Sequence, residues 1–119
     1  HISPFTVING LFDRAQKYAE KPPYSLPRRW KERKGTLDSE VPFNFVSTND
    51  ITGGNSGSPV INAQREVVGL IFDGNAHTFT WDFAFDQEQG RAVSVHSEII
   101  RYALKEIYHA EELLDEMSL

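Results

Sequence analysis

Alternating hydrophobic and polar positions dominate the middle of the chain and predict β-strands there. Pro42–Thr48 has phenylalanine at alternate positions and the period of two that is typical of a strand. Ser58–Asn62 and Glu66–Asp73 are apolar runs rich in β-branched residues, and the short segment 63–65 between them predicts an antiparallel hairpin. Val67–Phe72 is almost continuously apolar, which favours a strand that is buried on both faces.

A turn and two further strand candidates follow this hairpin. Asp73, Gly74 and Asn75 form a turn signal, in which Gly74 is free to adopt a positive φ. Thr78–Phe85 has an aromatic residue at every second position, and Arg91–Val95 is another short strand candidate. We therefore expect the middle of the chain to be entirely β.

Apolar residues at helical spacing predict helices at the two ends of the chain. In Pro4–Tyr18 they recur at steps of three and four residues, which indicates a short amphipathic helix after a turn. Lys21–Pro27 carries three prolines and is expected to be an extended connection. Ser97 is the expected N-cap of a C-terminal amphipathic helix, with Glu98 in its first turn and apolar residues continuing to Met117.

Composition fits an ordinary soluble globular protein and excludes several classes of function. The 119 residues suit a single domain, with 39% hydrophobic and 24% charged residues. The formal net charge of -5 argues against a nucleic-acid partner, and the basic stretch 28–34 is expected to be a solvated face. Without cysteine, the chain can form no disulfide, thiolate metal site or cysteine nucleophile. We expect no metal and no cofactor.

The chain also lacks the usual signals for the membrane or for export. No apolar run approaches the roughly 20 residues that are needed to span a bilayer. The first residues have neither the basic start nor the apolar stretch of a signal peptide. Because the chain starts without methionine, we expect it to be a processed or excised piece.

The glycine-rich segment Gly53–Pro59 has the residues that a serine nucleophile requires. A serine hydroxyl is a weak nucleophile, so an acyl-transfer enzyme also needs backbone N–H donors around the oxygen that becomes negative. Gly54 lets the backbone turn so that its own N–H and that of Ser56 can point at one oxyanion, and Gly57 leaves room for a substrate backbone. We interpret Ser56 as the catalytic serine.

Two other interpretations of this loop are a phosphate-binding loop and a plain turn. A phosphate-binding Walker loop requires Gly-Lys-Ser/Thr at the start of a helix, whereas Gly57 is followed by Ser58, Pro59 and a strand. A plain turn rich in Gly, Asn and Ser is common, and composition alone does not exclude it.

Segments on both sides of the loop resemble the C-terminal part of the bacterial dipeptidyl-peptidase 7/11 family. The resemblance covers most of the chain, including the terminal helix, and is carried by Phe43–Ser47, Thr48–Asn62, Val68–Asn75, Trp81–Phe83 and Arg91–Val95. The motif Gly-Asn-Ser-Gly-Ser-Pro alone is shared with high-temperature-requirement serine proteases, so the flanking segments carry the family assignment.

The resemblance implies a chymotrypsin-like serine exopeptidase that removes dipeptides from the free N-termini of oligopeptides. Ser56 matches the nucleophile and Gly54 the oxyanion position, while Gly74 matches the position that sets the preference for the second substrate residue. Members that prefer Asp or Glu are expected to carry arginine there, so glycine implies a hydrophobic preference. The resemblance also implies a periplasmic or cell-surface location.

The neighbours of Gly74 complete the expected substrate-binding group. Asp73 could bind the ammonium group of the substrate. An equally good interpretation is that its side chain bonds its own backbone as the first residue of a turn. Phe72 is the third substrate-binding candidate.

A general base is missing from the predicted triad. In chymotrypsin-like peptidases the order is His, Asp, Ser, and only His1 precedes Ser56. The later residues His77, His96 and His109 are expected to be structural or exposed, and no aspartate before the serine is a safe triad member. We expect an upstream part of the same protein to supply His and Asp, and this part alone to be inactive. Its exposed barrel interface would favour self-association, for example as a homodimer.

The expected fold is mainly β with a C-terminal helix and forms half of a chymotrypsin-like double β-barrel. Residues 1–41 are the expected helical and proline-rich connecting segment, 42–96 the C-terminal barrel portion, and 97–119 the helix. An endopeptidase of the high-temperature-requirement type and a non-catalytic peptide-binding module remain as alternative functions.

Overall fold

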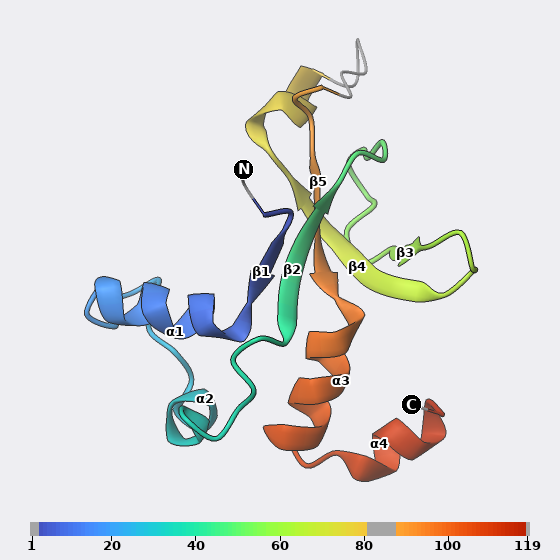
Figure 1. The fold of residues 1–119 in the computed structure, drawn as a ribbon. Coiled ribbons are helices and arrows are strands. Elements are labelled where there is room, and N and C mark those ends of the chain that lie inside the picture. The colour runs from blue at the N-terminus through green and yellow to red at the C-terminus, as the bar shows by residue number, and fades with distance from the viewer. Residues whose placement is uncertain (1–2, 81–87, 119) are drawn as a thin grey trace.

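The computed structural model describes residues 3–80 and 88–118, which form a five-stranded antiparallel sheet with helices at one end (Figure 1). The order of strands across the sheet is β1-β2-β5-β4-β3. The strands are β1 (Phe5–Val7), β2 (Pro42–Ser47), β3 (Pro59–Ile61), β4 (Val67–Gly74) and β5 (Ala92–His96). The helices are α1 (Ile8–Lys17), α2 (Arg28–Arg33), α3 (Ser97–Glu106) and α4 (Glu111–Glu116), with a 3-10 helix at Ala76–Thr80.

The pairing of the three central strands, β2, β5 and β4, places the last residues of β2 and β4 at the same end of the sheet. Because β5 is antiparallel to both of its neighbours, β2 and β4 run in the same direction. Ser47 at the end of β2 and Gly74 at the end of β4 both pair with Ala92 of β5. The last residues of β2 and β4 are therefore brought together at the end of the sheet away from the helices.

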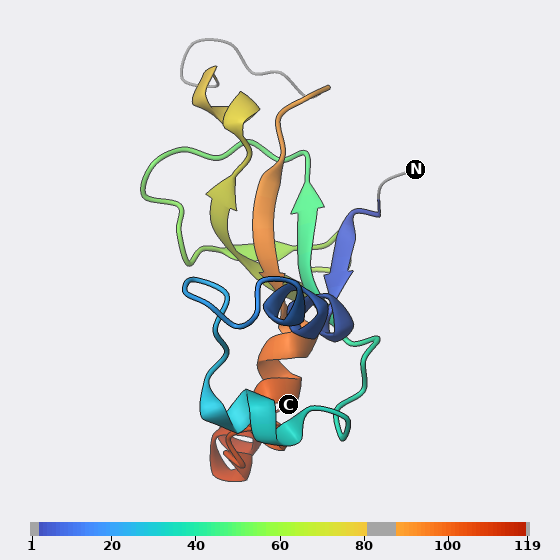
Figure 2. The ribbon, with the colours of Figure 1, turned by 90° about the vertical axis from the view of Figure 1, so that its left-hand side faces the viewer.

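The main hydrophobic core lies among the helices at the opposite end of the sheet (Figure 2). Its buried members come from α1, α2 and α3 and from the residue that follows α3: Ile8, Phe12, Trp30, Ile99 and Ile107. Burial of each large apolar side chain contributes roughly 1.5–3 kcal/mol, so this cluster anchors the lower half of the molecule.

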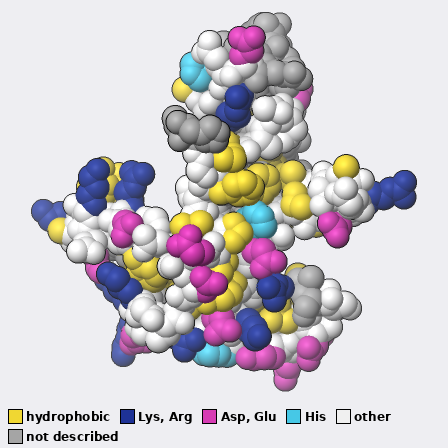
Figure 3. All heavy atoms as spheres, viewed as in Figure 1, with side chains coloured by type: hydrophobic (Ala, Val, Ile, Leu, Met, Phe, Trp, Pro, Cys, Tyr) yellow, Lys and Arg dark blue, Asp and Glu magenta, His cyan; other side chains and the backbone are white. Residues whose placement is uncertain are grey.

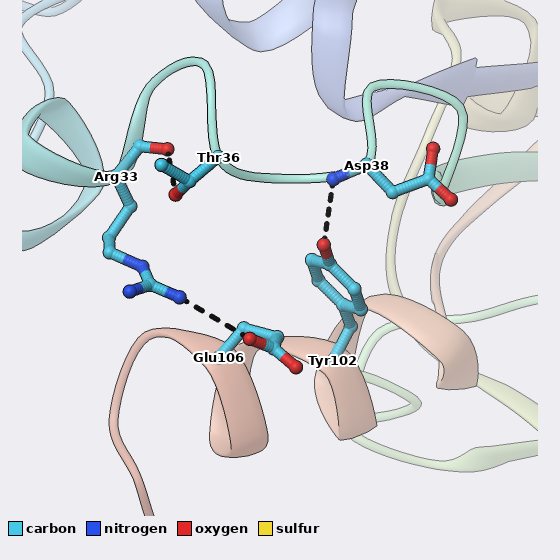
Figure 4. A network of polar contacts seen from close by, with 5 residues as sticks. All are labelled: Arg33, Thr36, Asp38, Tyr102 and Glu106. Atoms are coloured by element: carbon cyan, nitrogen blue, oxygen red, sulfur yellow. Dashed lines mark hydrogen bonds and ion pairs between the residues drawn. The ribbon is translucent and has the colours of Figure 1, made fainter.

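Polar contacts tie the connection after α2 to α3 (Figure 4). The N–H of Asp38 donates to the hydroxyl of Tyr102 at 2.7 Å. Arg33 pairs with Glu106 at 3.3 Å, and the side chain of Thr36 donates to the carbonyl of Arg33 at 2.8 Å. The segment between α2 and β2 is thus held against one face of α3.

The predicted strands in the middle of the chain are largely confirmed. β2 corresponds to Pro42–Thr48, β3 and β4 form the predicted antiparallel hairpin, and β5 corresponds to Arg91–Val95. Gly74, however, does not adopt a positive φ, because β4 continues through it. Thr78 begins no strand and lies in the 3-10 helix, while the remaining strand prediction at 81–85 lies outside the described residues.

The helix predictions needed several corrections. The first helix begins only at Ile8, after the short strand β1, and α2 was not predicted. His96 is the N-cap of α3 instead of Ser97, because its Nδ1 accepts the N–H of Glu98 at 3.0 Å. The C-terminal helix is divided into α3 and α4, with His109 at φ 51 between them. Within the described residues, helices contribute at least as much regular structure as strands, so that part of the chain is a sheet with helices and not mainly β.

The surface of the sheet carries more apolar area than expected. Val67 is 53% exposed and Phe72 is 47% exposed, so the prediction that β4 is buried on both faces was wrong for this chain. Hydrophobic side chains gather over the middle of the sheet in Figure 3. Phe5 of β1, Phe45 of β2, Val68 of β4 and His96 of β5 line a hollow on the sheet. Within the described residues, β1 and β3 are free edges, so the sheet is open.

The molecule is also less compact than an isolated domain of its length. The Cα radius of gyration is 16.0 Å, against about 13.5 Å expected for a compact domain of this size.

No helix in the described part of the chain is both long and apolar enough to cross a membrane.

Replacing Tyr102 with Phe tests the link between α3 and the segment before β2. The variant removes the hydroxyl that accepts the Asp38 N–H, a hydrogen bond worth about 0.5–1.5 kcal/mol. We expect several-fold faster amide hydrogen exchange in residues 36–41, measured by mass spectrometry. The control Tyr108→Phe removes only a 3.4 Å contact with Trp30 and should leave this segment unchanged. Equal exchange in wild type and Tyr102→Phe would contradict the assigned role.

Candidate active site

The loop between β2 and β3 is pinned to β4 by a reciprocal pair of backbone hydrogen bonds. The N–H of Gly57 donates to the carbonyl of Ile71 at 2.7 Å, and the N–H of Ile71 donates to the carbonyl of Ser58 at 3.0 Å. Because Ile71 is only 4% exposed, this attachment lies on a buried part of β4. Ser56, which immediately precedes Gly57, is thereby placed beside the last residues of that strand.

Asn55 closes the same loop from within. Its side-chain Oδ1 accepts the N–H of Thr52 at 2.7 Å, and its own N–H donates to the carbonyl of Thr52 at 3.1 Å. Its carbonyl accepts the N–H of Ser58 at 2.9 Å. Asn55 therefore stabilises the loop by three hydrogen bonds within it.

The loop contains two residues in the left-handed region, and both are glycines. Gly54 has φ 96 and Gly57 has φ 89, values that a residue with a Cβ rarely adopts. The N–H groups of Gly54 and Ser56 make no hydrogen bond with any described residue. Among the described residues, both N–H groups therefore lack an acceptor, and the oxyanion site stays a prediction.

A hollow of about 290 Å³ adjoins Ser56 and brings most of the predicted site residues together. Ser56, Phe72, Asp73 and Gly74 all line it, although the first comes from the loop and the other three from β4. Gly54 lies outside the lining, whereas its neighbours Gly53 and Asn55 are part of it. The other lining residues are Ile51, Thr52, Ile71 and Thr78.

Sequence reasoning missed Ile51 and Thr78 as parts of this hollow. Ile51 was interpreted only as part of the resemblance, and Thr78 as the start of a strand. The signal in the sequence was Gly74 directly after an apolar run, because a glycine inside a strand often indicates close approach by another group. A Cβ on residue 74 would overlap Oγ1 of Thr78 and lie 2.9 Å from Cδ1 of Ile51.

The side chain of Asp73 makes the hydrogen bond to the adjacent backbone that is expected of the first residue of a turn. Its Oδ1 accepts the N–H of Gly74 at 2.8 Å. The side chain is exposed at the border of the hollow, and Oδ2 has no partner among the described residues. One carboxylate oxygen therefore orders the backbone, while the other is free to accept a hydrogen bond from a bound cation.

No base is hydrogen-bonded to Ser56 within the described part of the chain. No hydrogen bond joins its Oγ to any of them, and His96 is engaged as the cap of α3. His77 lies in the 3-10 helix and His109 between α3 and α4, while His1 lies outside the described residues. Within residues 3–80 and 88–118, no three His, Cys, Asp or Glu residues cluster as a metal site would need.

Comparison with known families and curated proteins gives matches along the whole chain. The sequence profile of Peptidase S46 matches residues 1–119. The chain is 32% identical over 127 residues to dipeptidyl-peptidase 7 of Phocaeicola vulgatus, in a match that covers 100% of this chain and 17% of that protein. It is 41% identical over 127 residues to the Asp/Glu-specific dipeptidyl-peptidase of Shewanella putrefaciens, with coverage of 98% and 17%.

A solved structure has the same fold. The crystal structure of Porphyromonas endodontalis DPP11 in complex with the dipeptide Arg-Glu matches with a TM-score of 0.85 and 24% sequence identity. The match covers 98% of this chain and 18% of that one. The present chain therefore spans less than a fifth of the length of these relatives.

Alanine substitutions in the loop test whether its glycines are required for geometry. Gly57→Ala places a Cβ on a residue at φ 89, which costs roughly 1–2 kcal/mol. We expect it to weaken the attachment to β4, so the amides of residues 57 and 71 should exchange faster in hydrogen-exchange measurements. Gly53→Ala is the matched control, because Gly53 has no positive φ and no atom within 4 Å of an added Cβ. Equal effects of the two substitutions would contradict this account.

Proposed function

The chain belongs to the Peptidase S46 family, and on this basis we propose that it is the nucleophile-bearing part of a serine dipeptidyl peptidase. The observation that carries the proposal is the attachment of the glycine loop to β4, which places Ser56 beside the hollow formed with Phe72, Asp73 and Gly74. In this arrangement the serine hydroxyl has a neighbouring pocket for a substrate side chain. The expected substrate is an oligopeptide with a free N-terminus.

The proposed reaction begins with attack by Ser56 Oγ on the carbonyl carbon of the second substrate residue. The serine proton passes to a histidine supplied by the upstream part of the protein, which an aspartate orients. The negative oxygen of the tetrahedral intermediate accepts hydrogen bonds from the N–H groups of Gly54 and Ser56. When the C–N bond breaks, the histidine protonates the departing amine, and water then hydrolyses the acyl-enzyme to release the dipeptide.

We also propose that the open sheet is part of the C-terminal barrel of a chymotrypsin-like double β-barrel. Its free edges, exposed apolar residues and large radius of gyration all support a partner surface in the rest of the protein. Within this proposal, 1–41 is the connecting segment, 42–96 the barrel portion and 97–119 the C-terminal helical part. The same apolar surface is a candidate homodimer contact in the isolated chain.

The preferred second substrate residue is proposed to be hydrophobic. Among the described residues that line the hollow, Ile51, Ile71 and Phe72 are apolar, and none is a cation. A buried acidic side chain needs a cationic partner, whereas an apolar one does not. The names of the relatives do not decide the preference, because both dipeptidyl-peptidase 7 and Asp/Glu-specific enzymes are among them.

Two further parts of the proposal concern the substrate amine and location. Asp73 is a candidate partner for the substrate ammonium group, because its Oδ2 has no partner in the described part of the chain. A periplasmic or cell-surface location is proposed on the family resemblance alone.

Substitution of Ser56 in the complete protein tests its role in peptide cleavage. We expect Ser56→Ala to lower kcat for dipeptide reporters by about 10⁴–10⁶-fold, as the loss of other catalytic serines does. Ser58→Ala is the control, because the backbone carbonyl of Ser58 holds the loop to β4, while its hydroxyl makes no hydrogen bond with a described residue. Undiminished activity of Ser56→Ala would refute the proposal.

Two assays of the complete protein test the proposed hydrophobic preference and the proposed need for a free substrate N-terminus. Reporters with Leu or Met as the second residue should be cleaved with at least tenfold higher kcat/KM than the Asp reporter. Acetylation of the substrate N-terminus should abolish cleavage, because a dipeptidyl peptidase recognises a free amine. Better cleavage after Asp would contradict the hydrophobic preference, and efficient internal cleavage of blocked peptides would favour an endopeptidase.

A further inference from the structure

The side of the hollow at Gly74 is closed by two residues from different segments. Thr78 comes from the 3-10 helix and Ile51 from the loop that also carries Ser56. A Cβ added to residue 74 would overlap Oγ1 of Thr78, and it would lie 2.9 Å from both Cγ2 of Thr78 and Cδ1 of Ile51. Real Cβ atoms essentially never approach other atoms so closely. Position 74 therefore has no room for a side chain while Thr78 stays in place.

Thr78 is held in this position by hydrogen bonds to one backbone carbonyl. Its hydroxyl donates to the carbonyl of Asn75 at 2.7 Å, and its N–H donates to the same oxygen at 2.9 Å. Rotation of the side chain away from residue 74 would break the first of these bonds. Ile51, by contrast, meets residue 74 with the far end of a flexible side chain, which can move at small cost.

The carbonyl that holds Thr78 is itself fixed to the start of β5. The side chain of Asn75 donates to the carbonyl of Gln89 at 2.8 Å and accepts the N–H of Arg91 at 3.1 Å. The backbone N–H of Asn75 donates to the carbonyl of Arg91 at 2.9 Å. Thr78, which lines the hollow, thus forms a wall that is tied through Asn75 to the start of β5.

The chemistry of this wall suits an uncharged substrate side chain. The hydroxyl proton of Thr78 is already used in the bond to Asn75, so it is not free to donate to a carboxylate. The only charged residue among the described lining is Asp73, whose carboxylate would repel an acidic side chain. A cation at residue 74 would relieve this repulsion, but Thr78 occupies the space that its side chain would need.

From this geometry we infer that Thr78, with Ile51 beside it, is a specificity-determining residue of the pocket. Its side chain leaves room only for glycine at position 74, and it lines this side of the hollow with an uncharged group. Two consequences follow. A side chain at position 74 is tolerated only when Thr78 is shortened, and an arginine at position 74 alone does not make the pocket accept an acidic residue. The statement about substrates rests on the proposed dipeptidyl-peptidase function, whereas the statement about packing does not.

A double-mutant cycle of thermal stability tests the packing in the complete protein. Gly74→Ala adds only a Cβ, and we expect it to lower the unfolding midpoint clearly in the wild-type background. In a Thr78→Ala background, which lacks both overlapping atoms, the same substitution should have little effect. In the matched Thr78→Ser background Oγ1 is retained, so the loss should persist. Additive effects of Gly74→Ala and Thr78→Ala would overturn the inference.

Reporter cleavage by the complete protein tests the consequence for specificity. We expect Gly74→Arg to lower kcat/KM for both Leu and Asp reporters at least tenfold. Gly74→Arg with Thr78→Ala should then cleave the Asp reporter at least tenfold better than Gly74→Arg with Thr78→Ser. If Gly74→Arg alone accepts the Asp reporter as well as the Thr78→Ala combination does, the inference is wrong while the proposed function stands. If the wild type releases no dipeptide, the proposed function fails, and the stability cycle still decides the packing.

Discussion

The candidate site depends on the reciprocal hydrogen bonds between the glycine loop and Ile71. These bonds fasten Gly57 and Ser58 to a buried position of β4. The same strand ends three residues later at Gly74. The attachment at Ile71 therefore holds Ser56 close to the residues of β4 that line the hollow. The register of β4 against β5 then sets where the strand ends, and the helical core holds the other end of the sheet.

This arrangement explains how much of the site could be predicted from sequence. The strands β2 to β5 have alternating or β-branched patterns, and the Gly, Asn and Ser residues of the loop have strong turn preferences, so both were predictable. Ser56, Phe72, Asp73 and Gly74 consequently meet at one hollow as the sequence indicated. Thr78 was not predictable as a wall residue, because its place depends on bonds from Asn75 to residues more than ten positions away.

The errors elsewhere have similar physical causes. β1 has only three residues and is defined by its pairing with β2, while α2 has a single buried residue, Trp30, and no helical periodicity of its own. The division between α3 and α4 depends on a left-handed conformation at His109, which an amphipathic pattern does not encode. The predicted burial of both faces of β4 assumed a covering layer, and in the described residues Val67 and Phe72 are half exposed.

The central claim is that Ser56 is the nucleophile of a peptidase whose base lies elsewhere in the protein. The most direct measurement is to treat the complete protein with a fluorophosphonate, which labels activated serines, and to map the modified residue by mass spectrometry. The account predicts one adduct on Ser56 that disappears after denaturation of the protein before labelling. An adduct on Ser58 or on another serine, with Ser56 unmodified in a protein that cleaves peptides, would contradict it.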